Sequence, residues 1–149
     1  MEKFALNQEF IFGIEATTEN IKQWSFKSKK IIKTWPLVTD NPITALWADN
    51  MFLFIGDESG QLIQYTLTQK IMIAKKYGKL FEGHVKIIRT FGNLVVAIDS
   101  INNMKLLNIV NYAILYDFES FYTDVLFVYD ENNNAHANEN EETHHVNLV

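Results

Sequence analysis

The chain has 149 residues, of which 48% are hydrophobic and 13% aromatic, so length and composition predict one globular domain with a substantial core. It contains no cysteine, which excludes disulfides, thiol nucleophiles and thiolate metal sites and favours a reducing compartment. The net charge of −5 arises in residues 130–149, which carry five acidic and no basic side chains. The remaining chain is neutral and contains one arginine, which disfavours direct nucleic-acid binding.

The first residues, MEKFALNQEF, lack the basic region and the long apolar core of a secretory leader. The apolar runs, such as Met51–Ile55 and Leu94–Ile98, are short. A membrane-spanning helix needs about 20 apolar residues, so none of these runs could span a bilayer. We therefore expect a soluble, intracellular protein without a membrane partner.

Short runs of β-branched and aromatic residues alternate with Gly, Asn, Asp and Ser along the first 129 residues, and no helical spacing extends beyond a turn. The runs group into units of four strand-like segments, at about 2–35, 43–75 and 85–117, followed by one extra strand at 122–129. In the second unit the predicted strands are Ile43–Trp47, Met51–Ile55, Leu62–Leu67 and Ile71–Lys75.

The three units repeat one another. A shift of 42 residues aligns Ile43–Ile73 with Val85–Leu115 without a gap, and a shift of 41 or 42 aligns the first unit with the second. Four antiparallel strands per roughly 40–45 residues is typical of a β-propeller blade. The sequence therefore predicts an all-β fold, a partial β-propeller of about three four-stranded antiparallel blades over residues 1–129. A β-sandwich or a simple meander is the alternative.

The repeated stretch resembles WD-repeat propellers. Gly83-His84 precedes the third unit, and Ile21–Ser25 stands where that family has its Trp-Asp strand. The family's turn aspartate, six residues before the Trp, falls here on Thr18, Ser59 and Ile101. The usual His–Ser/Thr–Asp–Trp network cannot form in this arrangement, so we expect His84 to be a turn or capping residue.

A narrower resemblance concerns the order of Phe81-Glu82-Gly83-His84 followed by Phe91–Asp99. This order is similar to the N-terminal blades of a propeller subunit of the small-subunit processome, which assembles ribosomes. The resemblance implies a role in ribosome biogenesis and rRNA processing, and a nuclear or nucleolar location. Without it, a cytoplasmic location is expected.

The predicted docking site is a set of loops. In a propeller, the loops from the second to the third strand of a blade lie on the same rim as the loops between blades. We expect partners to bind there, through the following residues: Thr39, Asp40, Asn41, Asp57, Glu58, Ser59, Lys79, Glu82, His84, Asp99, Ser100, Asn102 and Asn103.

No residue pattern predicts catalysis, a cofactor or a metal site. Asp57, Glu58 and Asp99 fall in polar turns, whereas an acid–base pair needs a pocket that raises one pKa. The tail holds three histidines beside five carboxylates, which we interpret as a solvated segment rather than a metal site: His136, His144 and His145.

The lysines and the tryptophans could each have a binding role or a structural role. The lysines between residues 22 and 33, with Lys27–Lys30 at their centre, could bind RNA or an acidic partner, but a solvated turn is preferred. Trp24 and Trp47 are expected to pack between blades, and Trp35 is expected to be the most exposed tryptophan because Pro36 follows it.

The sequence thus predicts a non-catalytic protein–protein interaction scaffold that belongs to a multi-subunit assembly. The alternatives are a propeller enzyme of the quinoprotein or hydrolase type, or a trafficking or signalling scaffold. Partners are expected to be proteins, including those of a ribonucleoprotein. Three blades are fewer than the usual four to eight, so we expect either a piece of a longer propeller or self-association through open blade edges. Residues 130–149 are predicted to be a disordered acidic, Asn-rich tail.

Overall fold

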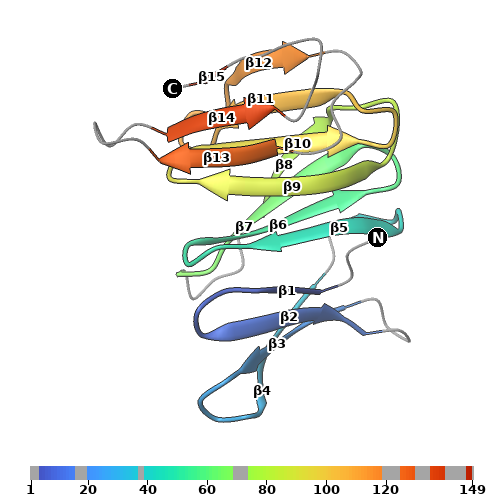
Figure 1. Ribbon diagram of the computed structural model, residues 1–149. Helices are drawn as coiled ribbons and strands as arrows, with labels where there is room; N and C mark the ends of the chain where they lie inside the picture. The colour runs from blue at the N-terminus through green and yellow to red at the C-terminus, as the bar shows by residue number, and fades with distance from the viewer. Residues whose placement is uncertain are drawn as a thin grey trace. The chain divides into compact units, whose positions relative to one another are not determined.

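Apolar strands and tight polar turns fold the chain into successive antiparallel hairpins (Figure 1). The computed structural model describes residues 4–15, 20–36, 39–68 and 74–118, and the backbone of further strands at 125–129, 135–139 and 147–148. These residues contain no helix, and therefore no helix that could cross a membrane. The chain divides into unit 1, Met1–Lys86, and unit 2, Ile87–Val149.

Unit 1 begins with blade 1, a meander of β1 (Phe4–Leu6), β2 (Phe10–Ile14), β3 (Ile21–Ser25) and β4 (Ile31–Trp35). Blade 2 repeats this strand order with β5 (Ile43–Ala48), β6 (Phe52–Asp57), β7 (Gln61–Thr66) and β8 (Ala74–Lys79). Both sheets are antiparallel throughout. The four-stranded blades predicted from the repeat are present.

The first turns of the two blades use equivalent residues. Asn7 Oδ1 accepts the amides of Glu9 and Phe10, and Asp49 Oδ1 accepts those of Met51 and Phe52, 42 residues later. Short Asn and Asp side chains stabilise such turns by satisfying amides that the strands leave unpaired. Asn7 Nδ2 also donates to the Asp49 carbonyl at 2.9 Å and joins the two turns.

The last strand of blade 2 extends further along the chain than the sequence predicted. The predicted strand was Ile71–Lys75, whereas β8 runs from Ala74 to Lys79, and residues 71–73 lie outside the described part of the chain. The β7–β8 ladder pairs Tyr65 with Ala74 and Gln61 with Lys79, and it contains a bulge between Gln61 and Ile63. Backbone pairing carries the strand to Lys79, because the segment AKKYGK has little apolar periodicity.

Unit 2 contains blade 3, formed by β9 (Val85–Phe91, whose first two residues belong to unit 1), β10 (Leu94–Asp99), β11 (Met104–Asn108) and β12 (Ile114–Phe118). Its apolar cluster of Val96, Ile98, Met104 and Leu106 is buried.

A three-stranded sheet follows, with β13 (Val125–Tyr129), β14 (Ala135–Glu139) and β15 (Asn147–Leu148). The extra strand after the third blade is therefore present. The tail was predicted to be disordered, and β14 and β15 depart from that prediction: β14 pairs with β13 over five residues, and β15 pairs with β14. The backbone N–H and C=O groups of the apolar strand β13 can bond to the backbone of a neighbouring segment. That segment can be polar, because this pairing does not require apolar side chains.

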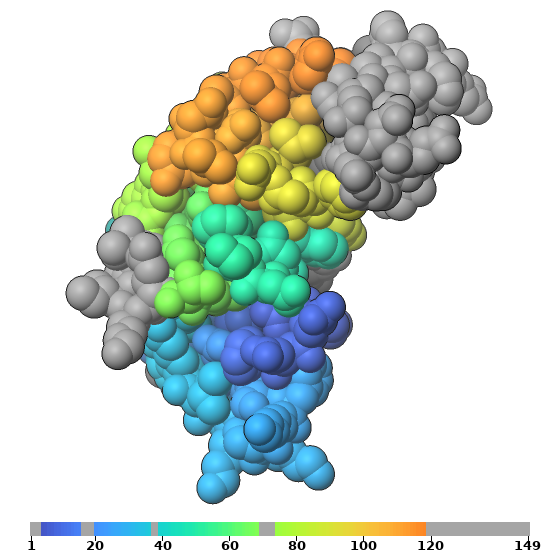
Figure 2. All heavy atoms as spheres, turned by 90° about the vertical axis from the view of Figure 1, so that its left-hand side faces the viewer, coloured from blue at the N-terminus to red at the C-terminus, as the bar shows by residue number. Residues whose placement is uncertain are grey.

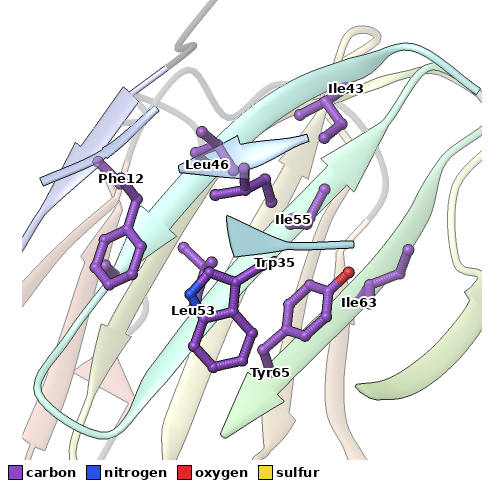
Figure 3. Close-up of a cluster of buried hydrophobic side chains, with 11 residues drawn as sticks. Phe12, Trp35, Ile43, Leu46, Leu53, Ile55, Ile63 and Tyr65 are labelled. Atoms are coloured by element: carbon purple, nitrogen blue, oxygen red, sulfur yellow. The ribbon is translucent and has the colours of Figure 1, made fainter. Parts of the chain in front are cut away.

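The core of unit 1 lies between blades 1 and 2 (Figure 3). Phe12 and Trp35 from blade 1 meet Leu53, Ile55 and Tyr65 from blade 2, and all five are buried. The residues that β6 contributes to this interface, Leu53 and Ile55, alternate along the strand because only one face of its sheet points toward blade 1, while Phe54 between them is buried on the opposite face.

The prediction that Trp35 would be the most exposed tryptophan is wrong, because Trp35 is 0% exposed. Its ring packs edge-on against Tyr65, with centroids 5.5 Å apart, and its Nε1 donates to Gln23 Oε1 at 2.8 Å. The Tyr65 hydroxyl donates to the Pro36 carbonyl at 2.7 Å. Strand β4 includes Trp35 as its last residue, so the strand still directs the indole into the core although Pro36 follows.

Trp35→Ala is expected to lower the free energy of unfolding by about 3–5 kcal/mol, because it opens a cavity and leaves the buried Gln23 amide without its partner. Ile32→Ala is the matched control on the same strand: Ile32 is 49% exposed, so a change within about 0.5 kcal/mol is expected. Urea denaturation followed by far-UV circular dichroism compares the two variants. Equal unfolding midpoints would contradict the role assigned to Trp35.

Candidate functional site

Three of the four predicted loops meet on one rim of unit 1, here called the unit 1 rim: Thr39–Asn41, Asp57–Gly60 and Lys79–His84. Thr39 Oγ1 donates to Asp57 Oδ2 at 2.7 Å, and Asn41 Nδ2 donates to Ser59 Oγ at 3.3 Å. The amides of Leu80 and Phe81 donate to the Gly60 carbonyl at 2.9 and 3.3 Å. The expectation that these loops share a rim is therefore met within unit 1.

Asp57 is the centre of this rim. Its carboxylate is completely buried, and Oδ1 accepts the Ser59 amide, the Ser59 hydroxyl and the Gln61 amide at 2.8–3.0 Å. Oδ2 accepts the Thr39 hydroxyl, so the side chain joins two loops that lie 18 residues apart. A buried carboxylate is stable only with such donors. Asp57 therefore organises the loops from inside and does not present its charge to solvent.

Gly60 permits the third loop to approach. It has a φ of +87°, and a Cβ atom there would lie 2.1 Å from the Phe81 carbonyl oxygen. Both the backbone angle and the contact therefore require glycine. Phe81 is buried beside this turn, so it anchors the segment that follows β8. The Ser-Gly pair in the sequence predicts a turn. The sequence around this turn does not predict that the Phe81 carbonyl packs against Gly60.

The exposed side chains of the rim carry mixed charge. Asp40, Glu58, Glu82 and His84 are exposed, as is Lys79, which forms a 3.3 Å ion pair with Glu82. A cavity of about 360 Å³ is lined by Thr44, Glu58, His84 and Lys86. Thr44 and Lys86 were not among the predicted residues, because they occupy strand positions rather than turns. The exposure of His84 agrees with a turn residue and not with a buried network.

The fourth predicted loop, Asp99–Asn103, lies in unit 2 and repeats the Asp57 turn. The buried Asp99 carboxylate accepts the Ile101 and Asn103 amides through Oδ1, at 3.2 and 2.7 Å. Ser100 and Asn102 are half-buried, and Asn102 has a φ of +65°, which asparagine tolerates better than most residues. Asp57 and Asp99 are thus equivalent buried turn residues, two positions before the expected WD-repeat aspartate.

The lysine cluster behaves as a solvated turn, as preferred from the sequence. Residues 26–30 form an exposed turn between β3 and β4. Lys22 lies on β3, where it donates to Thr34 and forms a 3.8 Å ion pair with Glu15, and the Lys33 ammonium lies over the Trp35 ring. Within the described ranges, no three acidic or histidine side chains gather in a way that could hold a metal. The side chains of the three tail histidines lie outside those ranges.

The face of blade 1 that points away from blade 2 is apolar. Phe4 and Leu6 are 64% and 55% exposed, and the strand register places Leu6 opposite Ile11 and Ile11 opposite Trp24. A cavity of about 450 Å³ is lined by Ile11, Trp24, Ser25, Phe26 and Lys29, whereas Phe4 and Leu6 line another with Leu46 and Trp47 of blade 2. The repeat aligns Phe4, Ile11 and Trp24 with Leu46, Leu53 and Tyr65, which blade 2 buries against blade 1. This face therefore has the chemistry of a blade–blade interface.

No protein-family model and no curated protein matches the chain. Solved structures do. The computationally designed Ika4 protein matches with a TM-score of 0.70 at 14% identity, over 98% of this chain and 87% of that one. The computationally designed Ika8 protein matches at 0.71 and 15%, over 97% and 43%. The WD40 β-propeller domain of Doa1 matches at 0.62 and 14%, over 87% and 43%.

At such low identity these matches show the fold alone. The chain spans less than half the length of the Ika8 and Doa1 chains. Together with the three four-stranded antiparallel sheets, they establish a propeller-like, all-β fold.

Two glycine variants separate the energetic cost of a clash with the Phe81 carbonyl from the cost of placing alanine in a left-handed backbone conformation. Gly78 has a φ of +81° but no atom within 4 Å of an added Cβ, so Gly78→Ala should cost only about 1–2 kcal/mol. Gly60→Ala adds a backbone clash and should cost at least about 2 kcal/mol more. Thermal unfolding of both variants measures the difference. An equal cost would mean that the segment after β8 moves aside freely.

Proposed function

We propose that this protein is a non-catalytic interaction scaffold and that partner proteins dock on the unit 1 rim. The observation that carries the proposal is the construction of this rim, in which a buried carboxylate and a close glycine contact fix three loops around exposed polar side chains. Binding residues are typically found on loops that a rigid scaffold positions. Fixed loops also lose little conformational entropy when a partner binds.

The exposed charges indicate what kind of partner suits the rim. Asp40, Glu58 and Glu82 are acidic, and Lys79, His84 and Lys86 lie among them. A surface of mixed sign favours a protein with matching polar groups over a uniformly charged nucleic acid. We include in this proposal that the chain is a WD-repeat protein, a family that it resembles at Gly83-His84.

Reversing two rim charges should remove partners without unfolding the protein. For Glu58→Lys with Glu82→Lys, we expect recovery of specific partners in affinity purification to fall about tenfold or more, because like charges then oppose the partner's basic groups. The matched control is Lys27→Glu with Lys30→Glu, which reverses two charges in an exposed turn between β3 and β4. Partners lost equally from both variants, or from neither, would exclude the rim as the docking site.

A narrower proposal is a role in ribosome assembly, with the nuclear or nucleolar location that this implies. It rests on the resemblance of Phe81–His84 and Phe91–Asp99 to a processome propeller subunit. Any RNA contact would then be indirect, through protein partners, because the body of the chain is neutral.

Affinity purification from cells tests this role directly. We expect ribosome-assembly proteins to be recovered together with RNA, and the RNA to be lost once protein partners are removed by high salt. The rim variant serves as the control, since it should lose both. Recovery of membrane-coat or signalling partners alone would reject the role in ribosome assembly and leave the general scaffold proposal standing.

A further inference from the structure

The outer strands of the three blades differ in how well they are protected against pairing with another strand. An edge strand exposes unpaired backbone groups, and natural proteins commonly guard such edges with lysines. The outer strand β8 carries three of its six residues as lysines, and β4 carries Lys33 at its centre. The outer strand β12, with the sequence ILYDF, has no lysine or arginine.

The apolar side chains of β12 lie on the surface. Ile114, Leu115 and Tyr116 are 49%, 44% and 49% exposed. In the space-filling view, the segment that contains β12 is visible on the surface in orange (Figure 2). The one charged side chain, Asp117, is already paired with Lys105 on β11. Within the described sheets, β11 is the only strand that pairs with β12, so the outer edge of β12 is open there.

We propose that β12 pairs antiparallel with β12 of a second copy of this chain, centred on Tyr116. In this register Tyr116 lies opposite Tyr116, and Leu115 lies opposite Asp117. Directly opposed aromatic pairs stabilise antiparallel strands, and no like charges face each other. The Tyr116 ring also stacks on Phe118, with centroids 5.7 Å apart, which presents a firm apolar surface.

The same symmetric pairing is unfavourable at the other outer strands. Antiparallel self-pairing of β4 would place Lys33 opposite Lys33, and two copies of β8 would bring six lysines together. Like charges directly opposite each other destabilise paired strands. Among the outer strands of the three described blades, β12 alone suits this symmetric pairing, and a twofold pairing through that edge closes at a dimer. This inference does not depend on the unit 1 rim.

Size-exclusion chromatography with light scattering of the full chain, over a dilution series, tests the pairing. The wild-type protein should have twice the mass of one chain. Tyr116→Lys should weaken the dimer by about tenfold or more, because it places two like charges opposite each other. Ile32→Lys is the control, since Ile32 is also 49% exposed and lies on the equivalent strand of blade 1, and it should leave the dimer intact.

A charge-swap experiment tests the register. Tyr116→Lys and Tyr116→Glu should each be monomeric, whereas their mixture should form a dimer through the opposed Lys and Glu. Far-UV circular dichroism verifies that each variant is folded. A monomeric wild-type protein at all concentrations, a dimer insensitive to Tyr116→Lys, or a mixture that stays monomeric would each overturn the proposal.

Discussion

Within the described sheets, the outer strand of each blade has a neighbour on one side only, so a side-chain tie to that neighbour adds to the backbone bonds that hold it in register. In all three blades a polar side-chain pair between the third and fourth strands supplies this tie: Gln23 with Trp35, Gln64 with Tyr77, and Lys105 with Asp117. In blade 1 the tie also directs the indole into the core. The interface between blades 1 and 2 depends on that orientation, because Trp35 is among its largest buried side chains.

The rim follows from the same arrangement. Once blades 1 and 2 are packed face to face, the loop that leaves β4 lies against the turn that leaves β6, and Thr39 can reach Asp57. The buried carboxylate then replaces water with four donated hydrogen bonds, which are worth more than neutral ones because the acceptor is charged. A surface built on this support changes little in shape when its exposed residues are substituted.

The sequence predicted the repeat, the all-β class and the strand order, because apolar runs and turn residues recur at nearly fixed spacing. It predicted the loops of the unit 1 rim for the same reason. It failed at Trp35, whose burial depends on a register bulge and on a glutamine 12 residues away. It also could not show that Asp57 is buried, because the Thr39 donor comes from another loop. The end of strand β8 was placed too early because backbone pairing, and not side-chain pattern, carries the strand to Lys79.

In the sheets that the structure describes, every strand of the three blades pairs only with the strand before or after it in the chain. Sheet formation therefore closes only short loops, and short loops cost little chain entropy. Fast, local folding is expected of such a topology, although the apolar face of blade 1 is buried only when blade 2 packs against it. A duplication or deletion of about 42 residues would also add or remove a whole blade without breaking a hydrogen-bonded ladder. The chain can thus change length during evolution in steps of one blade.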